Sequence, residues 1–153
     1  MAQPIRGLLA LLHLLGVIWW FGGMLFAYFC LRPAAAETLD PPKRLPLWTA
    51  AFERFLRYTA IAVVLIVVSG LTMLIETGFR NAPTGWLVMT GLGLLMTLIF
   101  GRVYLVLYPR LAAQCHISAW PAAAEEVNRM RRLVAINLVL ALGTVAAAVF
   151  ARH

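Results

Sequence analysis

The sequence predicts an all-α integral membrane protein, a single antiparallel bundle of four transmembrane helices. Its composition is 63% hydrophobic and only 12% charged, and its mean hydropathy is +0.87, which excludes an ordinary soluble domain. The chain also holds four apolar stretches, each long enough at ~1.5 Å per residue to cross a bilayer core of ~30 Å. Because these stretches use most of the 153 residues, we expect one transmembrane domain over residues 1–153.

The first predicted span covers residues 5–31, an apolar run interrupted by Arg6 and His13. A signal peptide has a shorter apolar core, usually ~7–15 residues, behind a positively charged start. Here the run is longer and most positive residues follow it. We therefore expect a retained helix rather than a cleaved leader.

The second predicted span covers residues 49–77 and opens with amphipathic turns, where Glu53 and Arg57 stand four residues apart. The preceding segment, residues 32–48, is rich in proline and charge. Proline interrupts helices, so this segment is expected to be a surface loop.

The third and fourth predicted spans cover residues 86–108 and 133–151. Residues 109–132 connect them as a polar loop, in which Pro121 is expected to open a short interfacial helix. Asn137 is the one strongly polar residue of the fourth span, and an amide there usually bonds to a neighbouring helix.

The basic residues indicate how the bundle is oriented. Ten of the 13 lysine and arginine residues lie in or beside the first and third connections. The positive-inside rule places these connections in the cytoplasm and both termini on the periplasmic side of a bacterial inner membrane. The same distribution accounts for the net charge of +7, so the bilayer is the expected partner and nucleic acid is not.

Glu53 is expected to form an ion pair across the bundle. It lies at the depth of Arg102 in the third span and of Arg132 before the fourth. A carboxylate withdrawn from water needs such a partner.

His13 is the main candidate functional residue. Ionisable groups within a membrane are costly, so they tend to face the protein interior and to have a function. On a helix, His13, Gly16, Trp20 and Gly23 form one stripe. The two glycines leave room for a flat ligand or for a closely packed neighbouring helix. The alternative role is a histidine that only forms a hydrogen bond across the bundle.

Depth within the bundle suggests which residues meet His13. Met73 in the second span and Met89 in the third are the thioethers at about its level, with Ser69 and Thr72 as hydrogen-bonding partners for the second ring nitrogen. Imidazole and thioether ligands suit a haem iron or a cuprous ion.

Several short patterns resemble two related membrane families, the HemJ-type protoporphyrinogen oxidases and the CopD-type proteins. They are His13 with Trp20-Phe21-Gly22-Gly23 and Phe26, the segment FERFLRY at 52–58 with Ser69-Gly70, Trp86-Leu87, and Arg131-Arg132 leading into Asn137. The resemblance implies four membrane helices, with His13 as a haem ligand of the HemJ type, whereas CopD-type proteins are associated with copper uptake or tolerance. Both families tend to carry a lysine where this chain has Thr90, so oxidase activity on porphyrinogens is not carried over and enzymatic activity stays open.

Three functions are therefore retained, in this order. The first is binding of haem b through His13 for electron transfer or a haem-linked redox step, with an unnamed redox partner and, for bis-histidine ligation, a homodimer. The second is CopD-like copper transport or tolerance, with His13, Met73 and Met89 as ligands. The third is a structural membrane subunit without a cofactor. No GxxxxGKS/T, GxGxxG, HExxH or CxxC motif supports another class.

Overall fold

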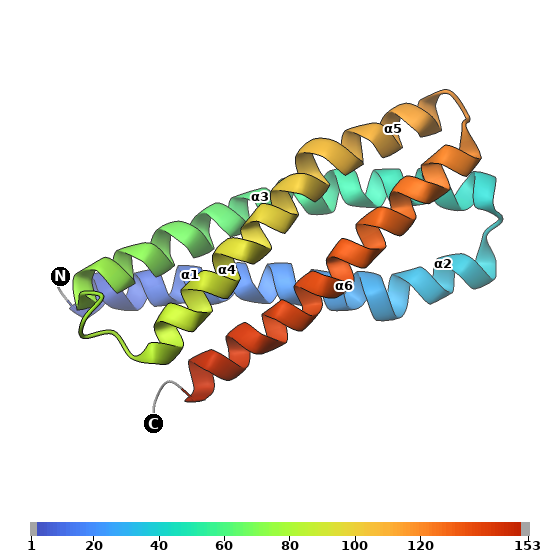
Figure 1. Cartoon of the computed structure of the whole chain (residues 1–153). Coiled ribbons are helices and arrows are strands. Elements are labelled where there is room, and N and C mark those ends of the chain that lie inside the picture. The colour runs from blue at the N-terminus through green and yellow to red at the C-terminus, as the bar shows by residue number, and fades with distance from the viewer. Residues whose placement is uncertain (1–2, 151–153) are drawn as a thin grey trace.

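The computed structural model describes residues 3–150, which form a bundle of long helices (Figure 1). The elements are α1 (Gln3–Phe26), η1 (Ala27–Leu31), α2 (Arg32–Thr38), α3 (Pro41–Thr77), α4 (Thr84–Arg102), η2 (Val103–Leu107), α5 (Tyr108–His116) and α6 (Trp120–Phe150). Four continuous helical stretches are long and apolar enough to cross a membrane, namely Gln3–Thr38, Pro42–Thr77, Thr84–His116 and Trp120–Phe150. The predicted all-α, multi-pass membrane bundle is confirmed. Ala151, the expected last residue of the fourth span, lies outside the described residues.

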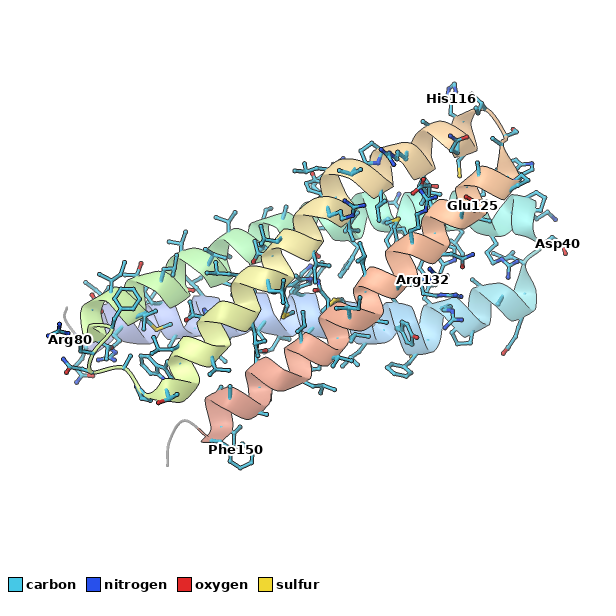
Figure 2. The ribbon with its side chains drawn as sticks, viewed as in Figure 1. Asp40, Arg80, His116, Glu125, Arg132 and Phe150 are labelled. Atoms are coloured by element: carbon cyan, nitrogen blue, oxygen red, sulfur yellow. The ribbon has the colours of Figure 1, made fainter. Side chains whose placement is uncertain are left out.

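The chain forms two helical hairpins. In the first, α1, η1 and α2 run out and α3 returns; in the second, α4, η2 and α5 run out and α6 returns (Figure 1). The turns at residues 39–40 and 117–119 therefore share one end of the bundle, which we call the basic end. The α3–α4 connection lies at the opposite end, where Gly78 closes α3 with a φ of +79° that favours glycine. Figure 2 shows Asp40, His116 and Glu125 at the basic end and Arg80 at the opposite one.

The segments expected to be loops are largely helical, which corrects the prediction for residues 32–48 and 109–132. Pro33 and Pro109 lie in the first turns of α2 and α5, where the missing N–H is tolerated. A five-residue π segment precedes each of these short helices and carries the helix onward. Pro121 does open a helix, but that helix is α6, which continues without a break through the fourth span.

The buried core runs from the apolar middle of the bundle into the basic end. Trp20 and Met24 on α1 are buried in the middle. Leu111 on α5 and Met130 on α6 are fully buried close to the basic end. Many large apolar side chains elsewhere are exposed, such as Ile18 on α1, as expected of helices whose outer faces contact lipid.

The predicted ion pair of Glu53 across the bundle is wrong. Glu53 pairs with Arg57 on its own helix at 3.3 Å, and both side chains are more than half exposed. Neither Arg102 nor Arg132 contacts it, because Glu53 lies on the outward side of α3, where a partner one turn away is available.

The carboxylate that is withdrawn from water belongs to Glu126 on α6, whose side chain is 11% exposed. Arg129, three residues further on, pairs with it at 3.0 Å, and Glu126 Oε2 has no hydrogen-bonding partner in the part of the chain that the structure describes. The same arginine also lies 3.7 Å from Glu125. Of the two ion pairs, Glu126–Arg129 in the second hairpin is therefore less exposed to solvent than Glu53–Arg57 in the first.

Candidate functional site

His13 joins α1 to α3 through one ring nitrogen. Its Nδ1 lies 3.0 Å from the Ile66 carbonyl oxygen and 3.1 Å from Ser69 Oγ. The Ser69 hydroxyl donates to the Leu65 carbonyl, so it is available to accept from Nδ1. A carbonyl only accepts, so Nδ1 carries the proton, and the lone pair of the neutral imidazole is left on Nε2. Gly70 makes the approach possible, because a Cβ there would lie 3.0 Å from His13 Cε1.

The glycines of the predicted stripe receive side chains of α3. A Cβ on Gly16 would lie 2.7 Å from Ile66 Cγ1 and 3.0 Å from the Ala62 carbonyl oxygen. A Cβ on Gly23 would overlap the Phe55 ring. Of the two uses predicted for this stripe, room for a flat ligand or for a neighbouring helix, the structure has the second.

The two tryptophans of α1 face different neighbours. Trp20 is buried and meets Phe100 of α4 edge to face, with ring centroids 5.8 Å apart. Trp19 is more exposed and its indole N–H donates to Thr59 Oγ1 at 3.3 Å. Trp20 thus connects the two hairpins, about two turns along α1 from His13.

Two threonines considered from the sequence are engaged with their own helices. Thr72 Oγ1 donates to the Val68 carbonyl at 2.7 Å, so Ser69 rather than Thr72 meets His13. Thr90, at the position where the resembling families tend to have lysine, donates to the Trp86 carbonyl at 2.8 Å.

Met73 and Met89, the candidate thioether ligands, lie closer than His13 to the end of the bundle that holds the α3–α4 connection. Met73 follows Ser69 by four residues on α3, about 6 Å further along the helix axis. His13 stands seven residues before Trp20 on α1, and Gly93 stands seven residues before Phe100 on α4, which contacts Trp20. Because α1 and α4 run in the same direction, Gly93 lies at about the level of His13, and Met89 lies one turn further from the basic end. Both methionines are half-buried. They share a level with each other, one turn from the imidazole.

Within residues 3–150, no three His, Cys, Asp or Glu side chains form a cluster that would hold a metal ion. His116 is exposed at the end of α5, and the neighbouring Cys115 accepts a hydrogen bond from Thr49 Oγ1 at 3.3 Å. A metal at His13 therefore needs soft or backbone ligands, or a second chain.

A cleft at the basic end was not anticipated from the sequence. It is lined by Arg32, Arg44 and Arg131 from three different helices. The spacing of Tyr28 on η1 and Arg32 on α2 indicates that they share one helical face, but periodicity carries no information about which helix covers that face.

The profile of the family described as Copper resistance protein D, CopD, matches residues 49–151, about two thirds of the chain. The chain belongs to the CopD family. The CopD match begins within α3 and runs through α4, α5 and α6, so His13 lies before it and its role must be argued from geometry. Neither the curated proteins nor the solved structures that were searched contain a match to this CopD-family chain.

Proposed function

We propose that this CopD-family membrane protein binds cuprous copper at His13 and serves in copper transport or tolerance. The observation that carries the proposal is the hydrogen bond from His13 Nδ1 to the Ile66 carbonyl at 3.0 Å. This bond fixes the tautomer and leaves Nε2 free to ligate, which is the usual arrangement around a metal-bound histidine.

The donor types near His13 favour a soft, singly charged ion. Met73 and Met89 supply neutral thioethers one turn away, and a neutral imidazole with thioethers suits Cu(I). A ligand set without carboxylates adds no negative charge to the apolar interior, so the ion would bring a charge of +1 only. Copper would be the cargo of this site and not a resident catalyst.

The packing of α1 against α3 also favours an ion over a macrocycle. Ile66 and Phe55 fill the space beside Gly16 and Gly23, so a porphyrin does not fit between these two helices as they stand. A single ion on Nε2 needs no such slot.

Haem b is the second candidate function, supported by the same Nε2 lone pair and by the HemJ-like pattern around His13. A haem would have to approach from the flank of α1 that α3 does not cover, or lie between two copies of the chain. Bis-histidine ligation would require that homodimer, and redox function would require a partner protein. A purely structural subunit is the third candidate, in which the His13 hydrogen bond only joins α1 to α3.

The experiment compares His13→Asn with His116→Asn in protein purified from cells supplied with copper. Asparagine can still donate to the Ile66 carbonyl but is a poor ligand for Cu(I). We expect bound copper, measured by elemental analysis under reducing conditions, to fall at least about tenfold in His13→Asn, a change of ~1.4 kcal/mol. The exposed His116 on α5 is the matched control and should have no effect.

Haem is measured in the same samples by pyridine haemochrome. If the parent contains haem and His13→Asn loses it, haem b rather than copper is the ligand of His13, and the second candidate function holds. Undiminished copper in a folded His13→Asn protein would contradict His13 as a ligand. Absence of both copper and haem from the parent, with lower thermal stability of the variant, would favour the structural role.

The proposal includes an orientation, with the basic end in the cytoplasm and both termini in the periplasm of a bacterial inner membrane. Its support is the concentration of arginine and lysine at the basic end. An impermeant thiol reagent should then label Asn81→Cys in intact cells. Labelling of native Cys115 would contradict this orientation.

A further inference from the structure

A cleft of about 350 Å³ opens at the basic end. Its walls come from the junction of α1 with α2, the first turns of α3 and the first half of α6. Three arginines line it, Arg32, Arg44 and Arg131, which we call the cleft arginines. Aromatic rings and small apolar side chains make up most of the remaining wall, and no aspartate or glutamate lines it.

The cleft arginines have no carboxylate partner among residues 3–150. The Arg32 guanidinium lies over the Tyr28 ring, 5.4 Å from its centroid. The nearby acids Glu125 and Glu126 pair instead with Arg129, which does not line the cleft. Three positive charges thus converge on one concave site with no protein anion to neutralise them.

The lining changes character along the bundle axis. Because α1 runs towards the basic end and α3 and α6 run away from it, Tyr28, Phe52 and Val134 form the deep wall, next to the membrane spans. Arg44 and Ala36 stand at the outer rim. On each wall the arginine therefore lies one or two turns nearer the surface than the apolar or aromatic residue at the deep end.

We propose that this cleft binds an anionic phospholipid, with its phosphate held by the cleft arginines. Guanidinium groups match phosphate oxygens with paired hydrogen bonds, and they retain their charge in a partly buried site. The glycerol and the first acyl carbons would lie against Tyr28, Phe52 and Val134. A small soluble phosphate compound held by the cleft arginines would leave this apolar wall without a contact. The depth of the cleft, at the boundary between spans and basic end, is the depth of lipid headgroups.

The test measures lipid retained by the full-length protein in native mass spectrometry, after exchange into detergent with phosphatidylglycerol or phosphatidylcholine. One variant carries Gln at all three cleft arginines. Its matched control carries Gln at three exposed arginines of the same end that lie outside the cleft, Arg54, Arg110 and Arg132. Both variants lose the same charge, so only the cleft distinguishes them.

We expect phosphatidylglycerol to bind the parent and the control, and its affinity for the cleft variant to fall on the order of a hundredfold. Equal loss in both variants would overturn the proposal, since attraction would then depend only on total charge. If the parent protein retained phosphatidylcholine as well as it retains phosphatidylglycerol, the proposal would be overturned too, because the net charge of the lipid would then not matter. Displacement by equimolar inorganic phosphate or glycerol 3-phosphate would assign the cleft to a soluble phosphate compound and overturn the lipid.

If the triple variant does not fold, Arg131→Gln and its neighbour Arg132→Gln form a smaller matched pair. Arg131 lines the cleft and Arg132 is exposed outside it. Weaker retention of phosphatidylglycerol is expected for the first only, and equal retention by both would overturn the proposal.

Discussion

The first hairpin, α1 to α3, and the second, α4 to α6, follow the same plan (Figure 1). Each begins with an apolar helix, passes through a five-residue π segment and a short helix with proline in its first turn, and returns in one long helix. Counting back from the π segments, His13 and Met89 each stand fourteen residues before Ala27 and Val103. An imidazole and a thioether therefore occupy corresponding positions in the two hairpins, although the Trp20–Phe100 contact staggers the hairpins by one turn, so Met89 is not at the level of His13.

The hairpins differ in how closely their helices pack. In the first, Gly16 admits Ile66 and brings α1 against the backbone of α3. In the second, a Cβ on Gly143 would make only an ordinary contact, 3.4 Å from Leu92 Cδ1. We call the contact between the two long helices of a hairpin its seam. The tighter seam, between α1 and α3, contains the intramembrane histidine, which suggests that close packing there fixes the imidazole. The looser seam, between α4 and α6, only completes the bundle.

The largest expected difference between the hairpins comes from adding one methyl group to each seam. Gly16→Ala should destabilise the protein by up to about 3 kcal/mol, because both Ile66 and the Ala62 carbonyl would have to move. Gly143→Ala should be neutral or stabilising by up to about 1 kcal/mol, since alanine is the better helix former and has space. Thermal unfolding in detergent measures both. Equal effects would mean that the two seams are packed alike.

A smaller difference is expected for the ion pairs. Arg129→Gln should cost about 1–2 kcal/mol, because it leaves the Glu126 carboxylate buried without its partner while Arg129 itself is half exposed. Arg57→Gln in the first hairpin should change stability by less than about 0.5 kcal/mol, since its pair with Glu53 is solvated. A stability loss of the same size in both variants, again by thermal unfolding, would contradict the assigned burial.

The smallest difference concerns one buried polar residue from each long returning helix, Thr59 on α3 and Asn137 on α6. Thr59→Val should cost less than about 1 kcal/mol, because the Trp19 indole N–H loses its acceptor. Asn137→Leu should be close to neutral, since Asn137 makes one long bond of 3.4 Å to the Met96 carbonyl and its Oδ1 has no partner among the described residues, 3–150. A loss above about 2 kcal/mol for Asn137→Leu would indicate that Oδ1 holds a ligand or a water molecule.

The spans could be predicted from the sequence because hydropathy over about twenty residues is a strong and local property. Their outer ends could not. Pro33 and Pro109 are normally boundaries, and the π segments that carry each helix past them leave no compositional mark. The predicted loops were therefore wrong for a conformational reason.

At the candidate site, matched depth was enough to place Ser69 beside His13, since antiparallel neighbours fix one axial coordinate. It was not enough for Glu53, because depth leaves the direction of a side chain around the helix unspecified. The cleft could not be predicted for the same reason. Arg32 and Arg131 are far apart in sequence, and they line one cleft only because of how α2 and α6 are rotated about their own axes. Whether His13 binds copper, haem or neither stays a prediction.

The π segments have one more consequence, for how such a protein can change. A five-residue π turn contains about one residue more than the α-turn it replaces, and each residue of an α-helix advances by about 100°. A π turn accommodates its extra residue by widening, so the helix beyond it keeps nearly the same orientation. Deleting one residue such as Cys30 would convert η1 into an ordinary α-turn and leave Arg32 facing the cleft, with His13 undisturbed. The same deletion within the regular helix α1 would rotate everything that follows by about 100° and turn Arg32 away from the cleft. The π segments are therefore the places where each hairpin can gain or lose a residue without altering either the basic end or the membrane interior.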